Sequence, residues 1–259
     1  MTETPSWPAP APGAAPLPAM VAAQARLETR LLLRNGEQLL LTLIIPLLLL
    51  AGFSAGNLVK VGSGPSVDFY VPGVIALAVL STAFTSLAIA TGFERRYGVL
   101  KRLGSTPLSR GGMILAKTAT VIAVEILQAA LIIAVGLALG WRPHAGPAGA
   151  VWVVLLVLAG TAAFSGLALA LAGVLRAEAT LAVANLVYLI LLGVGGILFP
   201  LSRFHGGAGV LALLPPGALS GGLRSVLAHS GGFPVRDLVV LLAWAAVTIT
   251  LAARTFRWE

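Results

Sequence analysis

Cysteine is absent from this chain, and its three histidines stand apart from one another. Disulfides and thiolate metal sites are therefore excluded. His144, His205 and His229 show no metal-ligand spacing, and no nucleophile stands beside a base in the sequence. We therefore expect no catalytic centre, no metal site and no bound cofactor within the chain.

Charged residues are scarce as well: they make up 10% of the chain, while 58% of its residues are hydrophobic. A soluble domain carries about 25% charged residues, so the composition excludes an ordinary soluble fold. Apolar runs of roughly 20 residues recur along the chain, and this length spans the hydrocarbon layer of a bilayer. The sequence therefore predicts an integral membrane protein.

The first 20 residues contain six prolines and no basic residue. A signal peptide begins with basic residues and continues into an apolar stretch, and both are missing here. We therefore expect no cleaved signal and interpret residues 1–19 as a disordered cytoplasmic tail.

The apolar runs predict an all-α membrane protein with six transmembrane helices in one membrane domain, residues 20–259. Before the first span, Arg26, Arg30 and Arg34 recur every four residues, which is typical of an interfacial amphipathic helix over 20–36; a plain extension of the first span is the alternative. The expected spans are 37–57, 69–92, 113–139, 149–173, 181–200 and 235–253.

The segment 201–234 breaks the pattern of long apolar runs. Its glycines and prolines prevent one continuous helix, yet its short apolar pieces resist exposure to water. We expect short re-entrant or interfacial helices with a water-exposed break fixed by Pro215 and Pro216, and our hypothesis is that they form the exit gate of a pathway. Arg224 is expected to reach lipid head groups or a neighbouring loop.

The basic residues predict the orientation. With the N-terminus in the cytoplasm, twelve Lys and Arg residues lie inside and five outside. This asymmetry favours both termini in the cytoplasm of a multi-pass cell-membrane protein, with a bacterial source expected. Because the basic residues flank apolar runs, we attribute the net charge of +8 to topology and to anionic lipids, and expect no nucleic-acid partner.

The loop 93–112 is the longest polar interruption between two clear spans. It combines a charged, helix-like piece with turn residues, which suits docking into a cytoplasmic partner; a basic loop that only fixes topology is the alternative. The loop resembles that of type-2 ABC-transporter permeases, the membrane subunits of drug, polysaccharide and lipid exporters. The residues that match the family pattern are Glu94, Arg95, Arg96, Gly98, Leu100, Lys101, Arg102, Leu103, Thr106, Pro107 and Leu108.

A second, weaker resemblance lies at Phe199-Pro200, Leu214-Pro215-Pro216 and Leu223-Arg224. Together these resemblances imply a permease that pairs with a second permease copy or homologue and with separate cytoplasmic ATPase subunits. The ATPases bind ATP and magnesium, and the loop couples them to the pathway. Its coupling residues are then Glu94, Arg95, Arg96, Gly98, Leu100, Lys101, Arg102 and Leu103. The implied function is export of a hydrophobic drug-like, lipid or glycan substrate.

The chain itself is not expected to hydrolyse ATP. Residues 111–118, GGMILAKT, depart from the phosphate-loop pattern by one residue, because Ala116 stands where glycine is required before Lys117. No strand is predicted before this stretch, and apolar helix surrounds it. We therefore interpret it as the start of the third span.

Glu125 is the one acidic residue deep in a predicted span, with Gln128 one turn later. A buried ionisable group costs several kcal/mol unless it is paired or hydrated. Either it contacts a cationic substrate or forms a proton-sensitive site, or it is protonated, hydrogen-bonded and packs helices together. Asn185 and Tyr188 are further pathway candidates. Two rival functions remain open: an ion-coupled carrier that uses Glu125, and a non-transporting structural or sensor protein.

Overall fold

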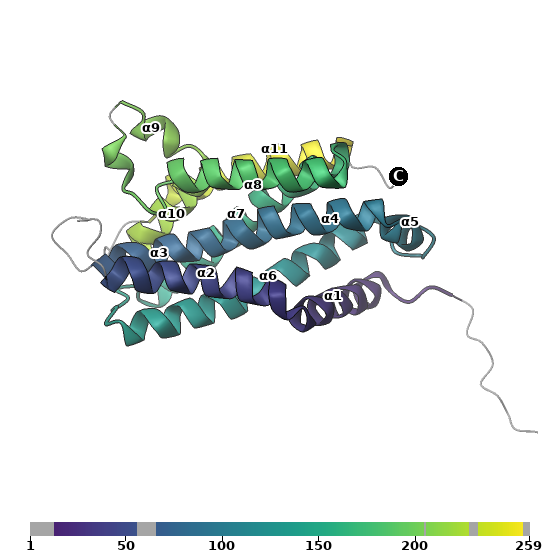
Figure 1. The fold of residues 1–259 in the computed structure, drawn as a ribbon, viewed down its shortest axis with the longest axis horizontal. Helices are drawn as coiled ribbons and strands as arrows, with labels where there is room; N and C mark the ends of the chain where they lie inside the picture. The colour runs from purple at the N-terminus through teal and green to yellow at the C-terminus, as the bar shows by residue number, and fades with distance from the viewer. Residues whose placement is uncertain (1–12, 56–65, 205, 228–232, 256–259) are drawn as a thin grey trace, which may run out of the picture.

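The computed structural model describes residues 13–55, 66–204, 206–227 and 233–255, and throughout these ranges the secondary structure is helical, without strands. Figure 1 shows the helices as an elongated bundle. In chain order they are α1 (Leu17–Arg34), α2 (Gly36–Ala55), α3 (Ser66–Val79), the π-helix η1 (Leu80–Ser86), α4 (Leu87–Arg96), α5 (Val99–Gly104), α6 (Arg110–Ala138), α7 (Pro147–Val174), α8 (Ala177–Val194), the 3-10 turn η2 (Leu201–Arg203), α9 (Ala208–Leu211), α10 (Pro215–Leu227) and α11 (Val235–Thr255).

The bundle has the expected membrane architecture. Five helices are long and apolar enough to cross a membrane: the continuous helix α3–η1–α4, α6, α7, α8 and α11. The sixth, α2, has 20 residues and an apolar stretch over Thr42–Ser54. The all-α membrane fold predicted from the apolar runs is thereby confirmed.

The fifth span is displaced from its predicted range of 181–200. The polar stretch 175–180 was interpreted as a loop, but α8 already begins at Ala177 and ends at Val194. Thr180 joins the helix because both its backbone N–H and its hydroxyl donate to the carbonyl of Arg176. At the other end, Gly195 and Gly196 stop the helix, with Gly196 at φ +67°, a conformation that suits glycine.

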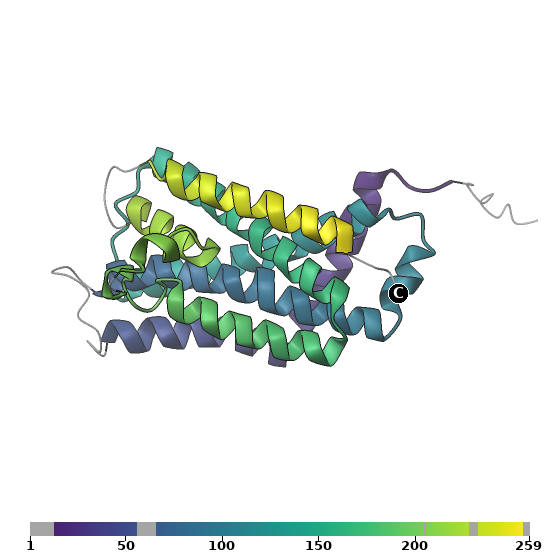
Figure 2. The ribbon, with the colours of Figure 1, turned by 90° about the horizontal axis from the view of Figure 1, so that it is seen from above.

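The long helix α3–η1–α4 forms the centre of the bundle, as Figure 2 shows from above. In its most apolar stretch 72% of the residues are buried. Its middle, η1, is a π-helix of seven residues. π-helices in proteins are concentrated at functional sites because they widen the helix and redirect side chains. The π-helix η1 therefore indicates a functional site in this part of the bundle.

The most extensive contact between helices joins α7 and α11. Gly166 makes the close approach possible, since a Cβ there would lie 2.5 Å from Thr248 Oγ1. Thr248 in turn donates a hydrogen bond of 3.0 Å to the carbonyl of Ala163. Small residues with a hydroxyl partner are the usual contact between membrane helices, and they fix α11 against the core.

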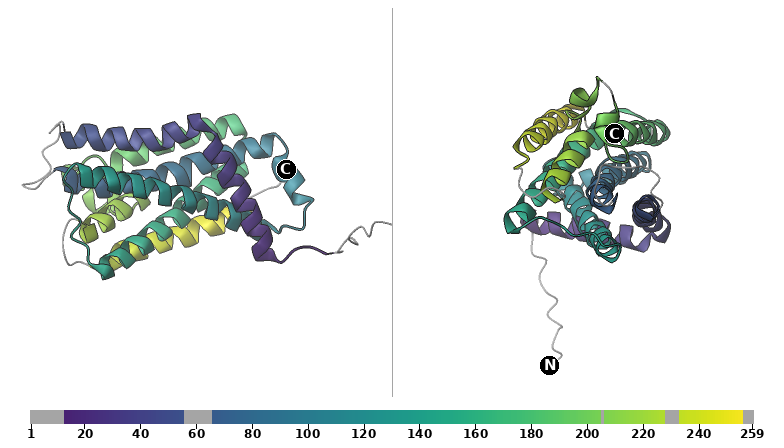
Figure 3. Two further views of the ribbon diagram at one scale, coloured as in Figure 1. Left: turned by 90° about the horizontal axis from the view of Figure 1, so that it is seen from below. Right: turned by 90° about the vertical axis from the view of Figure 1, so that its left-hand side faces the viewer.

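The amphipathic helix α1 runs obliquely across one end of the bundle (Figure 3). It begins at Leu17, within the stretch 1–19 that was predicted to be disordered, because Pro18 suits the first turn of a helix. Residues 1–12 of that predicted tail lie outside the described residues. The helix packs mainly on α6, and Thr120 donates to the carbonyl of Ala25 at 3.2 Å.

The opposite end is capped by α9 and α10, while α1, α5 and the end of α11 lie together at the first end (Figure 1). This placement agrees with an even number of crossings. Pro215 and Pro216 begin α10, four residues after α9 ends, as expected of prolines in a first turn. Both prolines are buried, however, so the expected water-exposed break is wrong at these residues; Leu213 is the exposed residue beside them.

Arg224 of α10 does not extend toward lipid. Its guanidinium donates to the carbonyls of Phe69 at 3.2 Å and Ile197 at 2.9 Å, and it lies 3.7 Å from the centre of the Phe69 ring. Of the two predicted contacts, lipid head groups are therefore wrong and a neighbouring loop is confirmed, because the guanidinium bonds to the Ile197 carbonyl in the loop after α8. Arg224 thus joins α10 to α3 and to the chain after α8.

Candidate functional site

The loop after α4 forms a short helix held by specific backbone features. Gly98 has φ +69° and begins α5, where an added Cβ would meet nothing within 4 Å. Its importance within the chain is therefore conformational, since other L-residues are strained at this φ. At the far end Ser109 caps α6 by accepting a hydrogen bond from the N–H of Gly112 at 3.1 Å.

The residues of α5 divide into an inner and an outer face. Leu100 is completely buried and Leu103 is partly buried, so they attach the helix to the bundle. Lys101 and Arg102 are exposed. The outer face of α5 therefore presents two cations at the end of the molecule, where a partner can reach them.

Arg95 and Arg96 are used differently from the exposed pair. Arg95 donates to the carbonyls of Gly173, at 2.7 Å, and of Leu175, which lie at the end of α7. Arg96 pairs with Glu178 in the first turn of α8. Both arginines therefore attach the end of α4 to the α7–α8 turn, within the chain itself.

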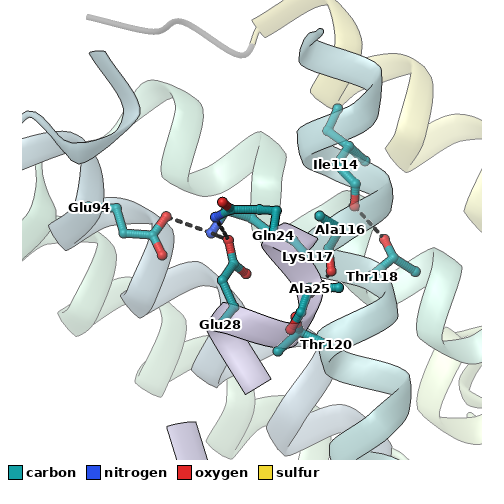
Figure 4. Close-up of polar contacts among 9 residues, drawn as sticks. All are labelled: Gln24, Ala25, Glu28, Glu94, Ile114, Ala116, Lys117, Thr118 and Thr120. Atoms are coloured by element: carbon teal, nitrogen blue, oxygen red, sulfur yellow. Dashed lines mark hydrogen bonds and ion pairs between the residues drawn. The ribbon is translucent and has the colours of Figure 1, made fainter. Parts of the chain in front are cut away.

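Glu94 pairs with Lys117 on α6, at 2.6 Å between carboxylate and ammonium, and the ammonium also lies 3.4 Å from Glu28 on α1. Figure 4 shows this triad of Glu28, Glu94 and Lys117. Arg95, the neighbour of Glu94 in sequence, does not take part, because it faces the α7–α8 turn. The Lys117 side chain is 2% exposed, and its long stem crosses the junction of three helices.

A cavity of about 230 Å³ opens beside this triad. Its walls come from α1, η1, α4 and α6. Leu31, Leu32, Leu87 and Val121 make it largely apolar, whereas the triad and the hydroxyls of Thr82, Ser86 and Thr120 make one side polar.

A second, larger groove of about 500 Å³ runs between α2 and α8 over η1. It shares Asn35, Ser86 and Ala90 with the first cavity, so the two hollows adjoin. Two of the predicted pathway residues, Asn185 and Tyr188, lie on its α8 wall. Ser81 and Thr85 of η1 lie on its floor, and the buried Thr85 hydroxyl has no hydrogen-bond partner among the described residues.

Glu125 and Gln128 lie away from this groove. Glu125 is buried and accepts a hydrogen bond of 2.6 Å from Thr161 of α7, beside an apolar void of about 20 Å³. Gln128 accepts from Thr82 and donates to the carbonyl of Thr42, both at 3.0 Å. The structure therefore does not bring the four pathway candidates together: one pair lines the groove, and the other connects helices behind it.

Several of these features were missed from the sequence. The run STAFT at 81–85 in an otherwise apolar span was the available signal for the polar floor of the groove. Lys117 was considered only as part of a phosphate-loop-like run, and 111–118 lies wholly within α6. Its ion pairs join residues distant in sequence, and no local pattern predicts them.

Comparison with known proteins agrees with this architecture. The family model described as "ABC-2 type transporter" matches residues 21–219. The match covers more than half of the chain and includes α1, the α5 loop, η1 and the groove. Comparison with curated proteins finds no match. The chain is thus a membrane component of a transporter and belongs to the ABC-2 type transporter family.

Proposed function

We propose that this chain is the permease subunit of an ATP-driven exporter. In this proposal a separate cytoplasmic ATPase docks on α5, and the α2–α8 groove is this subunit's half of the translocation pathway. A second permease, identical or homologous, closes the open side of the groove. A hydrophobic drug-like molecule, a lipid or a glycan is the substrate class that the family resemblance implies.

One observation carries the proposal: the floor of the groove lies in the long helix that ends directly before the docking loop. The helix α3–η1–α4 runs from Ser66 to Arg96 without interruption, with the groove floor in η1 and α5 attached directly after α4. Displacement of α5 therefore moves the groove floor, provided that the end of α4 remains attached to its neighbours. Arg95, Arg96 and Glu94 supply that attachment through α6, α7 and α8.

The polar floor supports a transport role for the groove. Thr85 places an unpaired hydroxyl on this floor, in a groove that Ser81, Asn185 and Tyr188 also line. A buried hydroxyl without a partner costs about 1–3 kcal/mol, and a passing polar group would remove that cost. Glu125 lies behind the groove and bonds to Thr161, so its position offers no support for the carrier alternative.

Crosslinking from α5 tests the proposal. The native chain contains no cysteine, so Lys101→Cys provides a single attachment point for a photo-crosslinker in membranes of the source organism. We expect one adduct that is also labelled by azido-ATP and that contains a phosphate-loop sequence. Arg203→Cys, exposed at the other end of the molecule, is the control. Absence of a nucleotide-binding adduct at position 101, or equal yield at position 203, would contradict docking on α5.

A further inference from the structure

The triad cavity, bounded by α1, η1, α4 and α6, has an unbalanced charge. Glu28 and Glu94 contribute two carboxylates and Lys117 one ammonium, and among the side chains that the structure describes no other charged one lines the cavity. The Glu28 and Glu94 side chains are only 16% and 25% exposed, so solvent screens them incompletely. With both carboxylates ionised, the cavity carries one net negative charge in a partly buried position.

Neighbouring cations do not neutralise this charge. Arg26, Arg30 and Arg34 line a separate hollow on another face of α1. Arg95 and Arg96 are engaged at the α7–α8 turn. On the cavity side Glu28 receives a hydrogen bond from the neutral Gln24, at 2.8 Å, and lies 3.4 Å from Lys117. The lysine is nearer to Glu94, at 2.6 Å, which leaves Glu28 as the carboxylate with the weaker partner.

The remaining wall is apolar and the cavity adjoins the groove. Leu31 and Leu32 of α1 line it together with Leu87 and Val121. Ser86 and Ala90 continue into the α2–α8 groove. A ligand held here thus meets a negative charge, an aliphatic surface and a passage to the groove.

From this geometry we propose that the triad cavity is an entry site for a small amphiphilic cation, with Glu28 as the counter-charge for its head and the leucine wall as the contact for its tail. The inference rests on the proposed export function and narrows its substrate class to amphiphilic cations. The amphipathic helix α1 places the cavity at the membrane surface, where such molecules concentrate. Entry from the inner leaflet then leads into the groove without crossing the bundle.

Binding to the purified full chain in phosphatidylglycerol nanodiscs tests this site. Calorimetric titration with hexyltrimethylammonium is expected to show saturable binding, and hexanesulfonate, with the same tail and the opposite charge, is expected to show none above that of empty discs. Glu28→Gln keeps the side-chain shape and removes the charge, so the cation affinity should fall roughly tenfold. Asp68→Asn, which removes a carboxylate outside this cavity, is the matched control and should leave the affinity unchanged.

The melting temperature of each variant confirms that it is folded before titration. Equal affinity for the cation and the anion, or unchanged cation affinity in folded Glu28→Gln protein, would overturn the proposal. Because this measurement contains no ATPase, it is independent of the export function. If the chain couples to an ATPase but does not bind the cation, only the cation site is refuted. If the chain binds the cation but does not couple to an ATPase, the exporter is refuted and the site remains.

Discussion

The side chains at the two ends of the bundle act as connectors between elements that are distant in sequence. Lys117 joins α1, α4 and α6 through two carboxylates, and Arg224 joins α10 to the ends of α3 and α8 through two carbonyls. A partly buried charge is tolerated only with such partners. Removing a single connector should therefore affect several helices at once.

Lys117→Met is the residue-scale test at the α5 end. It leaves Glu28 and Glu94 close together without a cation, and we expect the free energy of unfolding to fall by about 2 kcal/mol. The triple variant Lys117→Met, Glu28→Gln and Glu94→Gln removes the repulsion and should recover part of this loss. Thermal unfolding in detergent measures both. Equal stability of Lys117→Met and the native chain would mean that the triad is not a stabilising contact.

Gly73→Ala tests the connector at the other end. A Cβ at Gly73 would lie 2.7 Å from both Arg224 Nη2 and the carbonyl oxygen of Ile197, so α10 has to move away. We expect a loss of about 2 kcal/mol in unfolding free energy, as overpacking typically costs. Gly221→Ala in α10, where a Cβ meets nothing within 4 Å, serves as the matched control in the same thermal measurement. A loss of similar size in both variants would rule out the Arg224 contact as its cause.

Among the elements, those defined by apolar runs were predictable and those defined by contacts were not. A run of roughly 20 apolar residues determines a membrane helix by length alone, so α6, α7 and α11 agree with expectation within a few residues. The start of α8 was missed because Glu178 and Thr180 are polar. In the fold Glu178 pairs with Arg96, and Thr180 packs beside Gly92. The α5 loop was found through its motif, whereas the π-helix and the position of Glu125 depend on packing.

The π-helix offers a test at the scale of the element. A π-helix arises from an added residue in an α-helix, so deletion of Ser81 should return η1 to α-helix while the flanking helices persist. We expect the deletion variant to insert into the membrane normally and to lose transport, because the hydroxyl floor of the groove is redirected. Circular dichroism and membrane fractionation check the fold. Full transport by the deletion variant would show that η1 is not needed for the pathway.

At the scale of the whole molecule, one central helix connects a docking end to a capped end. The amphipathic helix α1 and α5 lie at the first end, and α9 and α10 close the second (Figure 1). The arrangement gives each end a distinct role in the proposed exporter. It also requires that the α5 end face the ATPase in the cytoplasm, in agreement with the distribution of basic residues.

Single-cysteine labelling tests this orientation. Ser105→Cys lies after α5 and Ser202→Cys lies in η2, and both positions are exposed. In intact cells a membrane-impermeant maleimide should label position 202, and should label position 105 only after the membrane is permeabilised. The reverse result would invert the proposed topology.

In the proposed exporter, movement of α5 by an ATPase reshapes the groove. The most direct test is the rate at which the cysteine of a Thr85→Cys variant is alkylated in the permease–ATPase complex. We predict that trapping with ATP and vanadate changes the alkylation rate at least several-fold. The change should persist with Gly98→Asn, because asparagine tolerates a positive φ, and with Gly111→Val, where a Cβ meets nothing within 4 Å. It should disappear with Gly98→Val, which cannot readily adopt the φ of +69°. An unchanged rate on trapping, or an undiminished change with Gly98→Val, would contradict the account.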